Sequence, residues 1–364
     1  MFSHIDPINY DKQLLEKQEN MTALFRDFNF SGFDIFTSEP MNYRQRAEFR
    51  VWHDGDDLYY IMFDQATKKK FKVEYFPVAC TLINELMSAL LTMVRDKPML
   101  RERLFQVDFL ATLSGEAVIS LLYHKQLSDE WQQQALWLKA QLAKICPINI
   151  IGRAKKQKII LEQDFVTEKL TVAGQELIYQ QVENSFTQPN AKVNEKMLTW
   201  AQDATRDKGG DLVELYCGNG NFSIALAANF DRVIGTEISK TSVKSAQINI
   251  AQNNISNIDI VRMSSEEFSQ AMNGERKFRR LEGFDLTSYN YDSVLVDPPR
   301  AGLDPDSIEL VSRFKHVVYI SCNPETLKDN LTELVKTHKI EKMALFDQFP
   351  YTHHIETGVI LTKR

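Results

Sequence analysis

Cys322 is the residue in this sequence best placed to act as a nucleophile. It follows the mostly apolar run 317–321 and stands two residues before Pro324, which suits the first turn of a helix. A helix N-terminus favours a thiolate, so this setting predicts a lowered thiol pKa. A buried, inert cysteine is the alternative. The nucleophile is favoured because ligands bind at strand ends when strands and helices alternate.

Glu356 is the matching candidate for a base, as the only acid between Asp347 and the end of the chain. A thiolate that adds to carbon 6 of uracil makes carbon 5 able to attack a sulfonium methyl group. A base must then remove the proton from carbon 5 before the thiol leaves. Thiol and carboxylate together suit methylation of uracil. The nearby His353 and His354 lack a third ligand at useful spacing, so no zinc is predicted.

A glycine loop follows the first expected strand of the second half. Gly218 and Gly220 form a G-x-G without the third glycine of a dinucleotide loop, which disfavours NAD. Glu237 ends the next strand, where an acid can accept both ribose hydroxyls of an adenosine. Alone, Glu237 fits a helix N-terminal carboxylate equally well. Loop and acid together resemble the S-adenosylmethionine site of class I methyltransferases.

Asp297 is followed by two prolines and Arg300. The prolines fix an extended turn that holds Asp297 at the edge of the sheet. Asp-Pro-Pro resembles the loop of amino-methyltransferases, in which an aromatic residue packs on the target base. Arg300 replaces that aromatic residue, so amine methylation is the weaker alternative.

The second half of the chain alternates short apolar strands with helices. We expect strands at 212–216, 232–237, 258–262, 293–297, 317–321, 343–346 and 358–361, and helices notably at 239–253 and 324–338. This alternation predicts a parallel, doubly wound α/β sheet with its ligand site outside the carboxyl ends of the strands. The first half has an α+β pattern, with helices at 11–28, 81–95 and 128–143 and strands at 46–53, 58–64, 104–113, 117–123 and 148–160.

The composition limits the class of protein. The 364 residues suffice for two domains, and a net charge of −6 argues against a general polyanion binder. The basic clusters 68–72 and 153–158 are candidate phosphate contacts or, equally, solvated edges. No signal peptide or membrane span is expected, which predicts a cytoplasmic protein. Four widely spaced cysteines predict free thiols, with no disulfide framework, structural zinc or iron–sulfur cluster.

Four segments carry a resemblance to a known family. Residues 214–222, 296–303, 319–327 and 347–356 resemble the RNA uracil-5-methyltransferases. Residues 46–55 and 183–190 look like the bacterial tRNA branch, which makes 5-methyluridine at position 54 of the T-loop. The ribosomal-RNA relatives usually carry an OB-like domain and four cluster cysteines, whereas this chain has no cysteine before Cys80. The resemblance covers nearly the whole chain.

The resemblance implies a division of labour along the chain. Residues 1–180 would form an α+β RNA-recognition region, and residues 181–364 a class I, Rossmann-like methyltransferase domain. Cys322 would be the nucleophile and Glu356 the proton acceptor. The residues implied in S-adenosylmethionine binding are Gln188, Tyr216, Gly218, Asn221, Glu237 and Asp297. Those implied in facing RNA are Glu48, Arg50, Phe105 and Arg300. Glu48 and Arg50 also suit a cross-strand ion pair, and Phe105 a core aromatic.

The implied activity is methylation of carbon 5 of uridine 54 in the tRNA T-loop through a covalent Cys–C6 adduct. T-loop-like RNAs such as tmRNA are further implied substrates. The expected partner is the tRNA T-arm, for a monomer with no metal and no obligatory protein partner. Two alternatives stay open: an RNA-folding factor whose chemistry is incidental, and an amine methyltransferase that needs no thiol.

Overall fold

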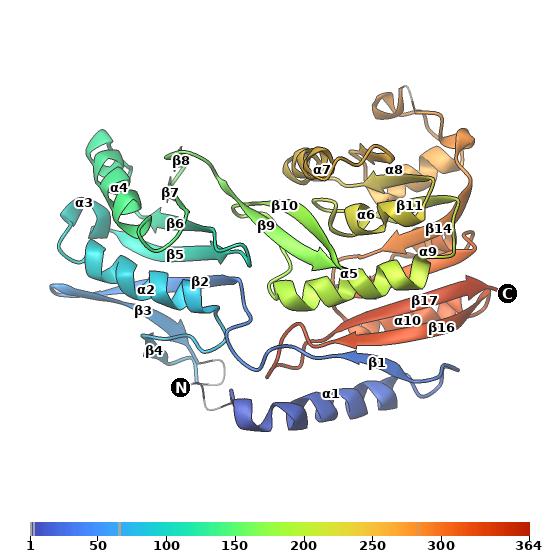
Figure 1. Cartoon of the computed structure of the whole chain (residues 1–364), viewed down its shortest axis with the longest axis horizontal. Coiled ribbons are helices and arrows are strands. Elements are labelled where there is room, and N and C mark those ends of the chain that lie inside the picture. The colour runs from blue at the N-terminus through green and yellow to red at the C-terminus, as the bar shows by residue number, and fades with distance from the viewer. Residues whose placement is uncertain (1, 3, 65–66, 283) are drawn as a thin grey trace. The chain divides into compact units, whose positions relative to one another are not determined.

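The computed structural model describes residues 2, 4–64, 67–282 and 284–364. Contacts divide the chain into two compact units (Figure 1). The first unit contains the stretch up to Pro7, Glu39–Lys169 and Gln180–Ala191, and the second contains Ile8–Ser38, Leu170–Tyr179 and Lys192–Arg364. The sequence predicts a single boundary at residue 180, which would make each unit one continuous half of the chain. Each unit instead combines three separate stretches. The difference arises because residues 8–38 pack with the C-terminal strands.

Eight described strands form the sheet of the second unit, in the order β1-β16-β17-β15-β14-β11-β12-β13. Their bounds are Phe33–Phe36 (β1), His338–Phe346 (β16), Glu356–Lys363 (β17), His316–Ser321 (β15), Tyr291–Val296 (β14), Asp211–Leu215 (β11), Arg232–Thr236 (β12) and Ile258–Val261 (β13). Neighbouring strands are parallel except at β17, which runs antiparallel to β15 and β16. The predicted α/β class with a mostly parallel sheet is confirmed.

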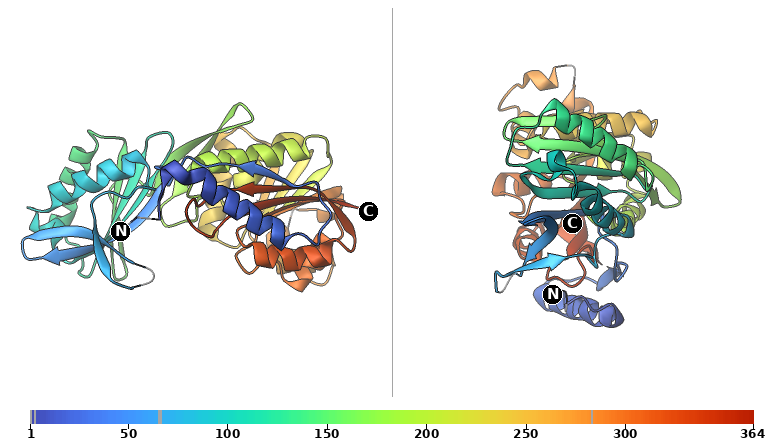
Figure 2. Two further views of the ribbon diagram at one scale, coloured as in Figure 1. Left: turned by 90° about the horizontal axis from the view of Figure 1, so that it is seen from below. Right: turned by 90° about the vertical axis from the view of Figure 1, so that its left-hand side faces the viewer.

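Helices cover both faces of this sheet. Their bounds are Tyr10–Leu24 (α1), Ala191–Thr205 (α5), Asn221–Leu226 (α6), Lys240–Gln252 (α7), Ser265–Met272 (α8), Pro305–Val311 (α9) and Pro324–Leu334 (α10). One core joins the sheet to α1, α8, α9 and α10 through buried residues such as Phe25, Phe268 and Leu331, each contributing about 1.5–3 kcal/mol. The left view of Figure 2 shows α1 beside α10 on this face. α5 packs on the opposite face, where a Cβ on Gly358 would come within 2.6 Å of the Trp200 ring.

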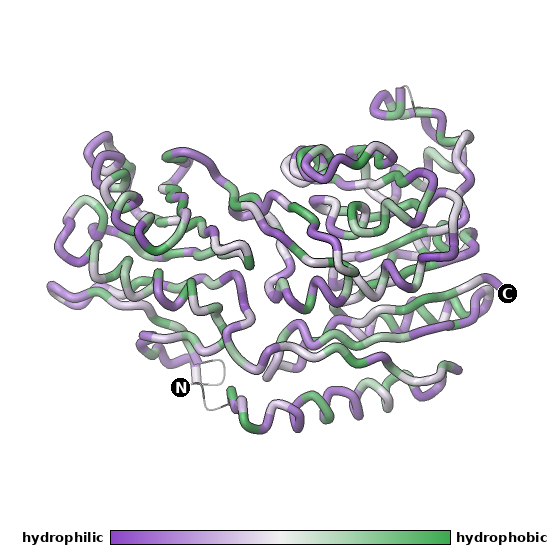
Figure 3. Tube along the Cα trace, viewed as in Figure 1, coloured by the Kyte–Doolittle hydropathy of each residue, from purple (hydrophilic) through white to green (hydrophobic). Residues whose placement is uncertain are grey.

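α1 is amphipathic, and its buried residues lie three or four positions apart. Tyr10, Leu14, Lys17 and Met21 form one buried stripe. Figure 3 shows apolar and polar residues alternating along this helix. β1 then pairs in parallel with β16, from Phe33 opposite Met343 onward. The sequence did not predict β1, because four residues are too few to show a period.

The first unit contains a seven-stranded sheet in the order β4-β3-β2-β5-β6-β7-β8. The bounds are Lys70–Val73 (β4), Asp57–Phe63 (β3), Arg46–Asp54 (β2), Leu104–Ala111 (β5), Ala117–Tyr123 (β6), Ile148–Ala154 (β7) and Gln157–Ile160 (β8). α2 (Thr81–Val94), α3 (Pro98–Arg101) and α4 (Asp129–Leu142) contribute to its apolar core. β9 (Phe165–Val172) and β10 (Gln175–Val182) form a separate ribbon. The single strand predicted at 148–160 is a hairpin instead, because Lys156 adopts a left-handed backbone with φ of 60°.

Among the residues described, no helix is both long and apolar enough to cross a membrane.

Candidate active site

One edge of the second unit's sheet gathers the residues predicted to be reactive. β15 ends just before Cys322, β14 ends just before Asp297, and β17 begins with Glu356. Ser321 is the partner of Thr357 in the antiparallel register, so the next residues along, Cys322 and Glu356, lie opposite each other. Adjacent strands lie about 4.8 Å apart. The thiol and the two carboxyl groups are therefore neighbours.

The carboxyl groups of Glu356 and Asp297 are recessed but unpaired. Glu356 is 5% exposed, and within the described parts of the chain neither carboxyl group takes part in a hydrogen bond or ion pair. The pKa of Glu356 is raised to about 8, mainly by burial and then by Asp297, while Arg300 acts in the opposite direction. Burial also raises the pKa of Asp297 to about 7. Groups that exchange protons near neutral pH suit acid–base work.

Cys322 differs from the prediction of a lowered thiol pKa. Burial, first, and then the carboxyl groups of Glu356 and Asp297 together raise its pKa to about 11. α10 does begin at Pro324, as predicted. Its N-terminus is capped by Asn323, whose Oδ1 accepts a hydrogen bond from the Glu325 N–H. Burial and adjacent carboxyl groups outweigh the helix end, so the thiol is protonated in the free protein.

Arg300 and His354 join two loops at this edge. Arg300 Nη2 donates to Nδ1 of His354 at 2.6 Å. The pKa of His354 is lowered by burial and then by His353, Arg300 and Lys17, so its imidazole is neutral and can accept this bond. The Arg300 carbonyl accepts a hydrogen bond from Asn323 Nδ2 at 2.9 Å. Arg300 is thus held beside Cys322 through both its side chain and its backbone.

The glycine loop lies at the ends of β11 and β12, further along the same edge. Tyr216 takes a left-handed backbone with φ of 64°, an uncommon conformation for an aromatic residue and one that is enriched at functional sites. Glu237 accepts hydrogen bonds from the N–H groups of Gly218 at 3.1 Å and Ser239 at 2.6 Å. A Cβ on Gly218 would meet nothing within 4 Å.

This open backbone beside a fixed carboxylate fits the adenosine part of S-adenosylmethionine. Asn221 is held differently, because its amide exchanges two hydrogen bonds with Asn194 of α5, at 2.9 and 3.0 Å. Its side chain therefore orients the start of α6. Within the residues described, no group of three histidine, cysteine, aspartate or glutamate side chains is arranged to hold a metal ion.

The remaining predicted residues, Gln188, Glu48, Arg50 and Phe105, belong to the first unit. Glu48 and Arg50 are exposed on β2, and in the described ranges neither forms an ion pair, so the cross-strand pair is not found. Phe105 is partly exposed and stacks on His124, with ring centroids 3.8 Å apart and planes at 10°. It is therefore not a fully buried core aromatic.

Two residues near this edge, Lys17 and Asp347, are not among the predicted site residues. Both are buried, and they form an ion pair of 2.7 Å beside the loop that leads to Glu356. A signal was present, since Lys17 interrupts the otherwise apolar stripe of α1. A lysine in such a position needs a buried acceptor.

Comparisons with known proteins show the family of the chain. A model of the tRNA (Uracil-5-)-methyltransferase family matches residues 9–364. The chain belongs to this family. Family membership confirms the predicted enzyme class, an S-adenosylmethionine-dependent methyltransferase.

Relatives in the family match the chain over its full length. The tRNA/tmRNA (uracil-C(5))-methyltransferase of Colwellia psychrerythraea is 72% identical over 364 residues, covering 100% of both chains. That of Pseudoalteromonas translucida is 59% identical over 360 residues, covering 99% of this chain and 98% of the relative. The Pyrococcus abyssi tRNA (uracil-54, C5)-methyltransferase, solved with S-adenosyl-L-homocysteine, shares the fold with a TM-score of 0.72 at 20% identity. That match covers 97% of this chain and 84% of the other.

Proposed function

We propose that this enzyme methylates carbon 5 of uridine 54 in the tRNA T-loop, giving 5-methyluridine, through a covalent bond between Cys322 and carbon 6. The observation that carries the proposal is the placement of Cys322 opposite Glu356 across the β15–β17 ladder. The relatives are named for action on tRNA and tmRNA, which supports tRNA as the substrate and T-loop-like RNAs such as tmRNA as further ones.

The first step is attack by the Cys322 sulfur on carbon 6. The thiol is protonated in the free enzyme, because burial and two carboxyl groups raise its pKa. It must therefore release its proton to solvent water when uracil binds. Arg300 lowers the thiol pKa and so favours the thiolate at that moment. As the S–C6 bond forms, the electrons of the C5–C6 double bond move onto the ring as an enolate.

Glu356 acts at the second stage. S-adenosylmethionine, when bound, supplies an electrophilic methyl group to the nucleophilic carbon 5. Glu356 then takes the proton from carbon 5, the C5–C6 double bond forms again, and the Cys322–C6 bond breaks. With a pKa raised to about 8, Glu356 must first release its own proton to water, and its ionised form is then a stronger base than an exposed carboxylate.

The two parts of the chain would divide the substrates. We assign RNA recognition to the first unit, which holds most of residues 1–180, and methyl transfer to the second unit, which holds most of residues 181–364. The residues proposed to hold S-adenosylmethionine are Gln188, Tyr216, Gly218, Asn221, Glu237 and Asp297, and those proposed to face RNA are Glu48, Arg50, Phe105 and Arg300. The Phe105–His124 stack supports a role for Phe105, because a flat, partly exposed aromatic pair suits base stacking. The protein would act in the cytoplasm as a monomer.

The proposal is tested with tRNA that contains 5-fluorouridine. Fluorine cannot leave as a cation, so the reaction should stop at the methylated adduct. We expect a protein–RNA band on a denaturing gel with the wild type and none with Cys322→Ala. Absence of the band with active wild-type enzyme would contradict the covalent route and leave amine-type methylation as the alternative.

RNA folding is proposed as a second activity of the same protein, since the target uridine must leave a folded loop to reach Cys322. The Cys322→Ala protein should then still speed the folding of unmodified tRNA. Failure of that variant to do so, while it binds tRNA normally, would limit the protein to methylation.

A further inference from the structure

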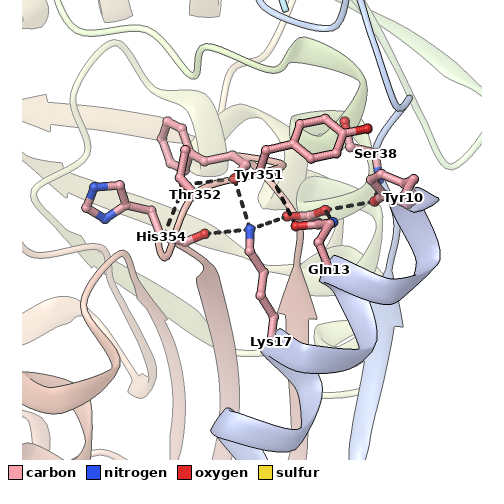
Figure 4. A network of polar contacts seen from close by, with 9 residues as sticks. Tyr10, Gln13, Lys17, Ser38, Tyr351, Thr352 and His354 are labelled. Atoms are coloured by element: carbon pink, nitrogen blue, oxygen red, sulfur yellow. Dashed lines mark hydrogen bonds and ion pairs between the residues drawn. The ribbon is translucent and has the colours of Figure 1, made fainter. Parts of the chain in front are cut away.

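Lys17 is a buried lysine with every donor occupied. It is 8% exposed on the stripe of α1 that faces the core. Its ammonium group donates to Asp347 Oδ1 at 2.7 Å, to the Phe349 carbonyl at 2.9 Å and to the His354 carbonyl at 3.0 Å (Figure 4). An ammonium group has three N–H donors, so these contacts satisfy it fully. Lys17 thereby connects the two ends of the loop 347–355.

Two further residues of α1 hold the same loop. Tyr10 Oη and Gln13 Nε2 each donate to Asp347 Oδ2 at 2.8 Å. Gln13 Oε1 accepts a hydrogen bond from the Tyr351 N–H at 3.1 Å. Figure 4 shows all three side chains, from successive turns of α1, pointing to this loop. The helix thus fixes the loop by its start, its middle and its end.

The contacts continue from the loop to the reactive edge. His354 stands two residues before Glu356, and its ring accepts the hydrogen bond from Arg300. The Arg300 carbonyl is in turn bound by Asn323, the residue after Cys322. An unbroken chain of polar contacts therefore joins Lys17 to the neighbour of the proposed nucleophile.

We propose that Lys17 is a positioning residue for the reaction, acting through the 347–355 loop on Glu356 and Arg300. This inference rests on the proposed function. The three contacts of Lys17 keep the His354 backbone in place, which keeps Glu356 buried opposite Cys322. Without Lys17, the loop loses the bonds at its end, and the Glu356 carboxyl group gains access to water. Proton removal from carbon 5 then slows more than methyl transfer does, whereas the binding of S-adenosylmethionine, further along the sheet edge, is unaffected.

The test compares three variants on unmodified tRNA. Lys17→Met keeps the side-chain length but leaves the buried Asp347 carboxylate without its cation. The double variant Lys17→Met/Asp347→Asn removes both charges and so separates lost positioning from the cost of an unpaired buried carboxylate. Lys12→Met is the matched control, because Lys12 is exposed on the same helix. Steady-state rates, the KM for S-adenosylmethionine and the fraction of enzyme trapped as methylated adduct after rapid quenching are measured for each.

We expect both Lys17 variants to lose about 10- to 100-fold in kcat, with an unchanged KM for S-adenosylmethionine. Methylated adduct should accumulate in both, and Lys12→Met should behave as the wild type. Full recovery of kcat in the double variant would overturn the proposal, because the stranded charge would then explain the whole defect. Loss of S-adenosylmethionine binding in parallel with activity would also overturn it, as general loss of fold. A wild type that forms no adduct on 5-fluorouridine tRNA would instead refute the proposed function.

Discussion

Two buried carboxyl groups stand at the two ends of one loop and have opposite surroundings. Asp347, at the start, is fully buried and receives hydrogen bonds from Lys17, Tyr10 and Gln13. Glu356, just after the end, is 5% exposed and has no such partner among the described residues. The satisfied carboxylate stabilises the structure. The unsatisfied one has a pKa raised to about 8, so it gains and loses its proton near neutral pH, which is typical of a reactive group.

The largest expected effect comes from removing the thiol beside the unsatisfied group. Cys322→Ser should reduce methylation by about 10³-fold or more while S-adenosylmethionine still binds, because sulfur acts on the base and not on the cofactor. Methyl transfer to tRNA and isothermal titration with S-adenosylmethionine measure the two properties. Cys146→Ser is the control, since Cys146 is buried in the core of the first unit and should leave activity intact. Substantial activity in Cys322→Ser would contradict the role of Cys322 as nucleophile, and with it the role of Glu356 as the base that resolves the adduct.

Glu356→Gln should separate the two stages of the reaction. Glutamine keeps the size of the side chain but removes the basic lone pair, so addition and methyl transfer proceed while elimination slows by about 10²- to 10⁴-fold. Each active site should consume one equivalent of methyl donor before turnover slows, and methylated adduct should accumulate without fluorine. Quenched-flow counting of transferred methyl groups measures this burst. Normal turnover would place the base elsewhere, with His353 and His354 tested next.

The contrast also predicts opposite effects on stability. The folded protein holds the Glu356 proton up to about pH 8, far above the range of an unfolded glutamate. This carboxyl group therefore destabilises the fold progressively as pH rises from about 4 to about 8. Glu356→Gln should raise the Tm at pH 8.5, by about a few degrees, and change it little at pH 4. Asp347→Asn should lower the Tm at both values, because it leaves the Lys17 cation buried. Calorimetry at the two pH values measures the Tm of each variant. A Glu356→Gln protein that is less stable than the wild type at pH 8.5 would contradict the contrast between Glu356 and Asp347.

The smallest effect concerns two groups of cations in the first unit, one in ion pairs and one exposed to solvent. Arg153 donates to Glu183 at 2.7 Å, and Lys158 donates to Asp164 at 2.6 Å. Much of the positive charge of the cluster 153–158 is therefore neutralised by acidic residues of the protein itself. Lys68 and Lys69 are exposed. Reversing both to glutamate should reduce the slope of log affinity against log salt by about 1 per lost phosphate contact. Arg153→Gln should change it less. Equal slopes for all variants would show that both clusters are solvated edges and do not contact phosphates.

The sequence predicted the reactive edge better than the elements that support it. Short apolar runs before Cys322 and Asp297 identified β15 and β14, because parallel central strands are buried on both faces and need no partner to be recognised. The strand β1 and the Lys17–Asp347 pair join residues more than 300 positions apart, and no local pattern specifies such pairing. The predicted lowering of the Cys322 pKa was wrong for the same reason. A helix start is visible in sequence, but carboxyl groups brought close by folding are not.

The pairing of β1 with β16 and of Lys17 with Asp347 has a consequence for how the protein is made. A ribosome synthesises Lys17 long before Asp347, because 330 positions separate the two partners. Until then, the buried stripe of α1 and the unpaired edge of β1 have nothing to pack against. The emerging chain must keep residues 8–38 from aggregating while the strands of the second unit are translated. We therefore expect the enzyme to become active only after residues 338–363 have left the ribosome and can pack against α1 and β1.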